Sequence, residues 1–213
     1  MKVLVLGGFL GSGKTTVLLK LAAWITAHSS RPMPLAIIEN EVGEVSVDGA
    51  ALRGYQVREL SAGCICCTLT AGLGMAIRQL YQDYDPEYII VEATGLAHMD
   101  KITEVIRRYL PEVSWLRAVV LADVARWDSL MEGLDVFLEN QLRGGDDILL
   151  NKCDLVSEED RMRLAEELKA LHPGGRLLMV SARSDISEAI QTILESGIDN
   201  ETAVPGEEKG GNL

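Results

Sequence analysis

The chain has 213 residues, of which 47% are hydrophobic, and this length is sufficient for one domain with a substantial core. Its 20 basic and 32 acidic side chains give a formal charge of −12, and a surface of this sign repels phosphate backbones and anionic membranes. We therefore expect neither nucleic acid nor a membrane as a partner. The sequence contains no apolar run that would span a bilayer, so we expect a cytoplasmic protein with reduced thiols.

Short apolar runs alternate with amphipathic stretches along most of the chain, which is typical of a mostly parallel sheet covered by helices on both faces. The expected strands are 2–6, 35–39, 56–60, 88–92, 118–121, 147–151 and 177–180. The expected helices are 14–27, 73–82, 101–109, 134–142, 158–171 and 187–194. We therefore predict an α/β fold with three layers over residues 1–196, followed by a flexible acidic and glycine-rich tail over residues 197–213.

The first expected strand leads into the stretch Gly7-Gly8-Phe9-Leu10-Gly11-Ser12-Gly13-Lys14-Thr15-Thr16 and then into a helix. Residues 8–15 satisfy the pattern G-x-x-x-x-G-K-[ST] of the phosphate-binding loop, or P-loop. Backbone N–H groups can surround a phosphate only where no Cβ intrudes, which explains the glycines. Lys14 can neutralise the outer phosphates, and the Thr15 hydroxyl can ligate Mg²⁺. The predicted nucleotide ligands here are Gly8, Gly11, Ser12, Gly13, Lys14, Thr15 and Thr16. The pattern indicates a P-loop NTPase fold, although a chance glycine-rich turn would look similar.

Two segments between the second strand and the next helix suggest a metal site. Residues 39–48 are acidic and contain a glycine, and residues 61–68 read Ser-Ala-Gly-Cys-Ile-Cys-Cys-Thr. Thiolates are soft ligands that suit Zn²⁺ and similar ions, but two or three sulfurs do not complete a tetrahedral shell. Carboxylates from the acidic segment are therefore expected to contribute. The candidate metal ligands are Cys64, Cys66, Cys67, Glu39 and Glu44. An apolar plug of cysteines or a redox-active thiol are the open alternatives.

The fourth expected strand ends in Glu92-Ala93-Thr94-Gly95. P-loop enzymes place a second Mg²⁺ contact and the loop that senses the γ-phosphate at this point. We expect Glu92 to bind Mg²⁺ through water or to orient the attacking water, and the Gly95 N–H to contact the γ-phosphate. With Lys14, these residues form the candidate catalytic set, unless the strand simply ends in a polar turn. The sequence shows no clear glutamine for positioning water and no obvious arginine finger, so we expect slow hydrolysis without a stimulating partner.

The sixth expected strand ends in Asn151-Lys152-Cys153-Asp154, the guanine-reading pattern of GTPases. The Asp154 carboxylate can accept hydrogen bonds from the ring N–H and the exocyclic amino group of guanine, a pair of donors that adenine lacks. We expect Lys152 to lie over the base, Asn151 to tie this loop to the P-loop, and Cys153 to line the base pocket. The residues Ser181, Ala182 and Arg183, after the last strand, suit a backbone N–H aimed at the guanine carbonyl. The predicted ligands are GTP and GDP, although four such residues also occur in ordinary polar turns.

Taken together and in their order along the chain, these motifs resemble those of the CobW-like P-loop GTPases. This group is related to the HypB and UreG accessory GTPases that insert nickel into hydrogenase and urease. The resemblance covers roughly residues 1–195 and is most specific at Gly63-Cys64-Ile65-Cys66-Cys67. It implies a GTPase that binds zinc, or alternatively cobalt or nickel, at this CxCC motif. It also implies delivery of the metal to a client metalloenzyme or maturation protein, or support of a cobalamin pathway. Members of the CobW branch usually carry a C-terminal domain, which we expect this chain to lack.

Two functional hypotheses follow from these motifs. In the first, GTP and Mg²⁺ order the segments that carry the metal ligands, and hydrolysis releases the metal. In the second, the chain is a regulatory module. A GTP-dependent homodimer or the docking of a partner, for example during activation of a corrinoid enzyme, is then its function without metal delivery. A small-molecule kinase with the same P-loop is disfavoured by the guanine-reading pattern.

Overall fold

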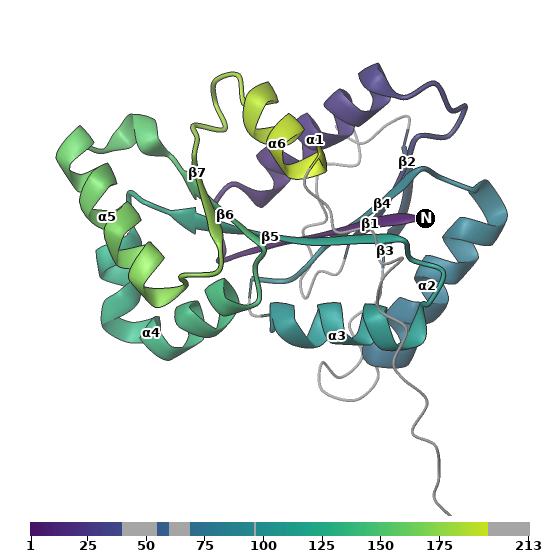
Figure 1. Ribbon diagram of the computed structural model, residues 1–213, viewed down its shortest axis with the longest axis horizontal. Helices are drawn as coiled ribbons and strands as arrows, with labels where there is room; N and C mark the ends of the chain where they lie inside the picture. The colour runs from purple at the N-terminus through teal and green to yellow at the C-terminus, as the bar shows by residue number, and fades with distance from the viewer. Residues whose placement is uncertain (40–54, 60–68, 96, 196–213) are drawn as a thin grey trace, which may run out of the picture.

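The computed structural model describes residues 1–39, 55–59, 69–95 and 97–195. Its centre is a seven-stranded sheet in the order β3-β2-β4-β1-β5-β6-β7, in which every neighbouring pair is parallel (Figure 1). The strands are β1 (Lys2–Gly8), β2 (Leu35–Glu39), β3 (Gln56–Glu59), β4 (Tyr88–Glu92), β5 (Trp115–Asp123), β6 (Asp147–Asn151) and β7 (Arg176–Met179). The predicted α/β fold class is therefore confirmed.

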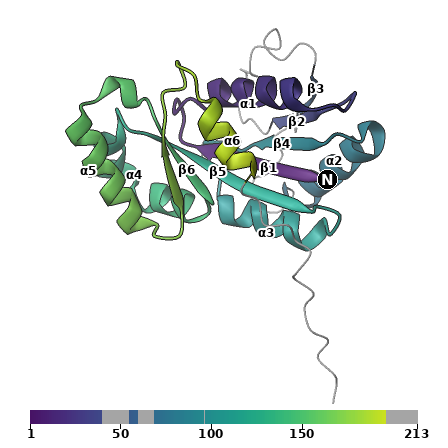
Figure 2. The same cartoon turned by 45° about the horizontal axis from the view of Figure 1, so that its top comes forward.

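Helices cover both faces of the sheet. They are α1 (Lys14–His28), α2 (Leu69–Tyr84), α3 (Met99–Tyr109), α4 (Trp127–Arg143), α5 (Glu158–Leu171) and α6 (Ser187–Glu195), with a short 3₁₀ turn, η1 (Cys153–Leu155). Figure 1 shows α1 and α6 on one side of the sheet and α2, α3 and α4 on the other, and Figure 2 shows the same layers from a tilted view. Residues of α5 belong to the same buried cluster as those of α2, α3 and α4. Within the described ranges, no helix combines the length and apolarity needed to cross a bilayer.

The strands in the middle of the sheet contribute to a core on each face. In β1, Val3 and Val5 pack with α2 and α3, whereas Leu4 and Leu6 pack with α1 and α6, because successive side chains of a strand point to opposite faces. All four side chains are fully buried. A strand that is buried on both faces is continuously apolar rather than alternating, which is the reason its sequence is so easily recognised.

The expected elements are all present, but some begin or end elsewhere. The largest difference is in α4, which begins at Trp127 and not at residue 134. Leu134 has non-helical dihedral angles, φ −137° and ψ 19°, so the helix bends there and only its second half follows one apolar stripe. Strand β5 is also longer than expected, Trp115–Asp123 instead of 118–121. The expected tail lies outside the described residues.

Because all strands are parallel, their carboxyl ends meet at one edge of the sheet, and ligands in such folds bind at this edge where the strand order reverses. The P-loop, Glu92 and Asn151 follow or end β1, β4 and β6, so the sequence motifs meet at this edge. The order reverses around β1, since β4 and β5 flank it on its two sides. The P-loop therefore occupies the centre of the binding edge.

The opposite edge of the sheet holds an ion cluster around Asp147, at the start of β6. The Asp147 carboxylate is fully buried and accepts hydrogen bonds from Nε of Arg117 at 2.7 Å and from Nε of Arg176 at 2.7 Å. Arg176 also donates to the carbonyl of Thr192 in α6 at 3.0 Å. This carboxylate thus connects β5, β6 and β7 with a helix, and two cations compensate its desolvation.

We predict that Asp147→Ala lowers the free energy of unfolding by about 3–5 kcal/mol, because the change leaves two partly buried guanidinium groups without their carboxylate. The measurement is urea denaturation at one fixed GDP concentration, since a bound ligand adds to the apparent stability. The matched control is Glu139→Ala, which removes the solvent-exposed pair with Arg143 and is expected to cost less than about 1 kcal/mol. Equal losses in the two variants would contradict the prediction.

Candidate functional site

The loop between β1 and α1 has the backbone geometry of an anion cradle. Gly8 and Gly13 have φ of +138° and +99°, a region that side chains disfavour, and Gly13 is the N-cap of α1. A Cβ on Gly13 would overlap Nδ2 of Asn151, and one on Gly8 would lie 2.8 Å from the carbonyl oxygen of Leu121. The first turn of α1 has neither an acidic side chain nor a side-chain cap. Its backbone N–H groups and positive dipole end can therefore act on an anion.

Polar side chains of the loop lie close to this cradle. The Lys14 side chain is largely buried, and its Nζ lies 3.5 Å from the carbonyl oxygen of Phe9. Ser12 is fully buried, and its Oγ makes no hydrogen bond within the described part of the chain. Thr15 is partly buried, and Thr16 is exposed. The expected phosphate ligands are thus gathered at one helix N-terminus.

The Asn151 side chain connects three loops at this edge. It is almost completely buried; its Nδ2 donates to the carbonyl of Ser12 at 2.8 Å, and its Oδ1 accepts from the N–H of Ala182 at 2.9 Å. The P-loop, the end of β6 and the segment after β7 are therefore held in one arrangement. The expected tie between the guanine-reading loop and the P-loop is present.

Asp154 is held in its ionised form by the segment after β7. Oγ of Ser181 donates to Oδ1 of Asp154 at 2.6 Å, and this hydrogen bond lowers the pKa of the Asp154 carboxyl below its usual value. The carboxylate is exposed, so it can accept further hydrogen bonds from an incoming base. Sequence reasoning placed both residues in the site, but not the hydrogen bond between them.

Sequence reasoning missed a buried carboxylate beneath the site. The side chain of Asp123, at the end of β5, is fully buried and accepts from Nζ of Lys152 at 2.7 Å and from Nε of Arg126 at 2.6 Å, both at Oδ2. Lys152, which has φ +68°, is therefore anchored by a neighbouring strand. The signal in the sequence was an acidic residue directly after the apolar run 118–122, in the position that Glu92 has at the end of β4.

These loops enclose a cavity of 250 Å³. It is lined by Gly11, Gly13, Thr16, Asn151, Lys152, Asp154, Leu155, Ser181, Ala182 and Arg183. One expectation is wrong here, because Cys153 does not line the cavity. Its side chain packs in the apolar core, its Sγ lies 3.1 Å from the Leu150 carbonyl, and burial raises the pKa of its thiol. Its neighbours Lys152 and Asp154 line the cavity, whereas Cys153 belongs to the buried core.

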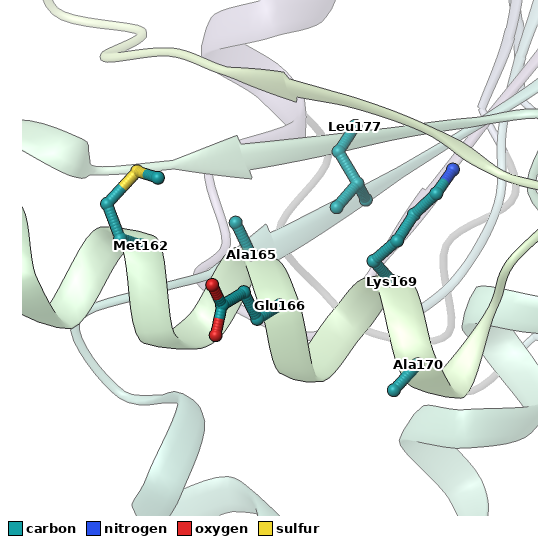
Figure 3. Close-up of a pocket in the computed structure, with 6 residues that line it drawn as sticks. All are labelled: Met162, Ala165, Glu166, Lys169, Ala170 and Leu177. Carbon is teal, nitrogen blue, oxygen red and sulfur yellow. The ribbon is translucent and has the colours of Figure 1, made fainter.

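A second cavity, of 440 Å³, lies between α5 and the edge strand β7 (Figure 3). Figure 3 shows Ala165 of α5 pointing toward Leu177 of β7, with Met162 farther along the helix. Its two charged residues are Glu166 and Lys169, and Lys169 donates to the carbonyl of Gly175 at 3.0 Å. This lining contains neither a glycine-rich loop nor the residues of the guanine-reading pattern, so the P-loop cavity is the better candidate for a nucleotide.

Two acidic residues lie beside the P-loop at the ends of neighbouring strands. Glu39 of β2 is directly opposite Glu92 of β4, and Glu92 is opposite Leu6 in β1. The Glu39 side chain is buried, whereas Glu92 is partly exposed. With the Thr15 hydroxyl, Glu92 supplies oxygen donors of the kind that Mg²⁺ prefers, next to the anion cradle. These residues therefore fit a Mg²⁺-nucleotide complex.

The remaining metal candidates cannot be placed, since Glu44, Cys64, Cys66 and Cys67 lie outside the described residues. In the part of the chain that the structure describes, histidine, cysteine, aspartate and glutamate side chains form no group of three that would hold a metal ion.

Gly95, the expected γ-phosphate sensor, lies beside Leu10, since a Cβ built on it would be 3.1 Å from the Leu10 nitrogen. The buried Gln141 of α4 donates to the Gly95 carbonyl at 3.0 Å.

Residues 2–179 match the family described as CobW/HypB/UreG, nucleotide-binding domain. Among curated proteins, the zinc chaperone YjiA of Escherichia coli (strain K12) is 31% identical over 174 residues, covering 75% of this chain and 52% of that protein. The zinc chaperone YeiR of the same organism is 30% identical over 161 residues, covering 74% of this chain and 48% of that protein. The chain thus spans about half the length of these relatives.

Solved structures show the same fold. HypB from Helicobacter pylori in complex with nickel has a TM-score of 0.66 at 19% identity, covering 92% of this chain and 86% of that one. Zn(II)-bound YjiA GTPase from E. coli has a TM-score of 0.60 at 24% identity, covering 87% of this chain and 59% of that one. The fold is therefore shared with these two proteins although the sequence identities are below 25%.

We predict that Gly13→Ala lowers the affinity for GDP by at least about 10-fold, because the new Cβ occupies the position of Asn151 Nδ2 at a left-handed backbone conformation. Titration with a fluorescent GDP analogue measures the affinity. Gly74→Ala is the matched control, since a Cβ at this position in α2 has no neighbour within 4 Å. Affinities of the two variants within about 2-fold of each other would contradict the role given to the cradle.

Proposed function

The chain belongs to the CobW/HypB/UreG family of P-loop GTPases, and we propose that it binds GTP, hydrolyses it slowly to GDP and phosphate, and uses this cycle to control a bound transition metal. The observation that carries the proposal is the position of Asn151, whose amide joins the anion cradle to the guanine-reading loop. The same cavity is lined by Gly11, Gly13 and Thr16 of the P-loop and by Asp154, the proposed base reader, which supports one nucleotide site.

In the proposed nucleotide complex, the P-loop N–H groups and Lys14 bind the phosphates. Asp154 accepts from the guanine ring N–H and amino group, and the N–H of Arg183 donates to the guanine carbonyl, since that of Ala182 already donates to Asn151. Thr15 would hold Mg²⁺, which would neutralise charge on the phosphates. Glu92 would bind this ion through water or orient the attacking water, and Gly95 would contact the γ-phosphate. These assignments rest on the position of the residues at, or directly after, the carboxyl ends of the parallel strands.

The cargo that we propose is Zn²⁺, with Co²⁺ and Ni²⁺ as alternatives, bound by Cys64, Cys66 and Cys67 with Glu39 and Glu44. Two relatives are named zinc chaperones, and thiolates favour such ions. Glu39 lies in register with Glu92, so one of the metal candidates is one strand away from the nucleotide machinery. The thiolates would require the reducing cytoplasm, and the recipient would be a client metalloenzyme or maturation protein.

We predict that Asp154→Asn converts the base preference from guanine to xanthine. An asparagine amide donates where the carboxylate accepted, so it repels the guanine amino group and matches the carbonyl that xanthine carries at the same position. The measurement is a competition between GDP and xanthosine diphosphate, with an expected reversal of preference of at least about 10-fold, a step of about 1.4 kcal/mol. Loss of GDP affinity without any gain for xanthosine diphosphate would contradict direct reading of the base by Asp154.

We also predict that Zn²⁺ binds more tightly when a non-hydrolysable GTP analogue is bound than when GDP is bound, by about 5-fold or more. By linkage, Zn²⁺ must raise the affinity for the analogue over GDP by the same factor. Calorimetric titrations in both orders measure the two factors. Cys66→Ser should weaken Zn²⁺ binding and leave GDP affinity nearly unchanged.

The matched control is Cys153→Ser, since Cys153 is buried in the core and is not a proposed ligand. Equal Zn²⁺ affinities in the two nucleotide states would defeat the coupling. Stimulation of a client by the metal-free protein would favour the regulatory module, in which a GTP-dependent dimer or partner docking is the function.

A further inference from the structure

Arg126 immediately precedes α4, and its guanidinium lies against the P-loop. Its Nη2 donates to the carbonyl of Leu10 at 2.7 Å. A Cβ built on Gly11 would lie 3.0 Å from the same nitrogen, so the guanidinium passes directly over the P-loop backbone. Gly11 also lines the nucleotide cavity. An arginine from a distant part of the chain is therefore positioned at the rim of the anion cradle.

Lys14 and Arg126 contact consecutive carbonyls of the same loop. Nζ of Lys14 lies 3.5 Å from the carbonyl oxygen of Phe9, and Nη2 of Arg126 lies 2.7 Å from that of Leu10. The P-loop pattern predicts that Lys14 binds the outer phosphates, so the Arg126 guanidinium contacts the same loop as this predicted phosphate ligand.

A buried anchor aims the Arg126 side chain. Its Nε donates at 2.6 Å to Oδ2 of Asp123, and the same oxygen accepts from Lys152 at 2.7 Å. The Asp123 side chain is fully buried, whereas that of Arg126 is 44% exposed. Nε of the guanidinium is therefore held by a buried partner, while the side chain remains partly accessible from solvent. The hydrogen bonds to Asp123 and Leu10 use two of the five N–H donors of the group. A planar guanidinium suits phosphate oxygens geometrically.

We propose that Arg126 contacts the outer phosphates of bound GTP, as an arginine that the chain supplies to its own P-loop. The inference rests on the proposed GTPase function and is independent of metal delivery. In hydrolysis the water oxygen bonds to the γ-phosphorus while the bond from that phosphorus to the bridging oxygen breaks. Negative charge moves to the β-phosphate of the departing GDP, and the proton of the water passes to the released phosphate. A guanidinium at the Leu10 end of the loop stabilises this charge.

The test compares Arg126→Gln, Arg126→Lys and the control Arg143→Gln, which changes an exposed arginine in the last turn of α4. We expect Arg126→Gln to lower kcat for GTP by at least about 10-fold, and the affinity for GTPγS relative to GDP by a similar factor. GDP affinity should stay within about 3-fold, and GDP with aluminium fluoride, a mimic of the transferring phosphoryl group, should bind less tightly. Arg126→Lys should recover part of each loss.

A purely structural clamp would behave differently. It would lower the thermal midpoint and reduce the affinities for GDP and GTPγS by equal factors, and this result would overturn the inference. A kcat of Arg126→Gln within about 2-fold of that of Arg143→Gln would also overturn it. If the unchanged chain does not hydrolyse GTP, the proposed function fails, and the ratio of GTPγS to GDP affinity still decides the role of Arg126.

Discussion

The candidate site depends on one buried amide. Asn151 donates to the Ser12 carbonyl and accepts from the Ala182 N–H, so its two hydrogen bonds set the distance between the P-loop and the two loops that surround the base position. A buried amide that lost one partner would leave a polar group unsatisfied, at a cost of about 1–3 kcal/mol. The constraint is therefore local and strong. It holds the P-loop and the loop after β7 in one arrangement around the proposed nucleotide site.

A buried carboxylate at the end of β5 stabilises the same group of loops. The Asp123 carboxylate is fully buried and serves two cations, Lys152 in the base-reading loop and Arg126 beside the P-loop. A lone buried carboxylate is costly, whereas one with two hydrogen-bonded cations is compensated. The arrangement places positive charge close to the anion cradle of a chain whose formal charge is −12. Side chains close to the loop, rather than the net charge, therefore decide whether a phosphate is attracted there.

Much of this architecture could be predicted from the sequence. The apolar runs of β1, β4 and β6 are buried on both faces and are easily recognised, and the P-loop pattern and Asn151 to Asp154 follow them directly. The family and the parallel sheet were predicted and are confirmed.

The first half of α4 was not predicted, because the bend at Leu134 interrupts its apolar stripe. Arg126 was missed because only the fold brings it to Leu10. Pairings of this kind depend on tertiary contacts between residues more than a hundred positions apart, and local patterns carry no information about them.

Strand β6 carries two different tasks at its two ends. Asn151, at its carboxyl end, serves the nucleotide cavity, and Asp147, at its amino end, joins three strands and a helix through Arg117 and Arg176. The strand is short and straight, with about 3.3 Å between residues, so the two ends stay well apart. A substitution in the ion cluster is therefore expected to change the stability of the fold without altering any residue of the nucleotide cavity, so thermal stability and nucleotide affinity can be engineered separately in this strand.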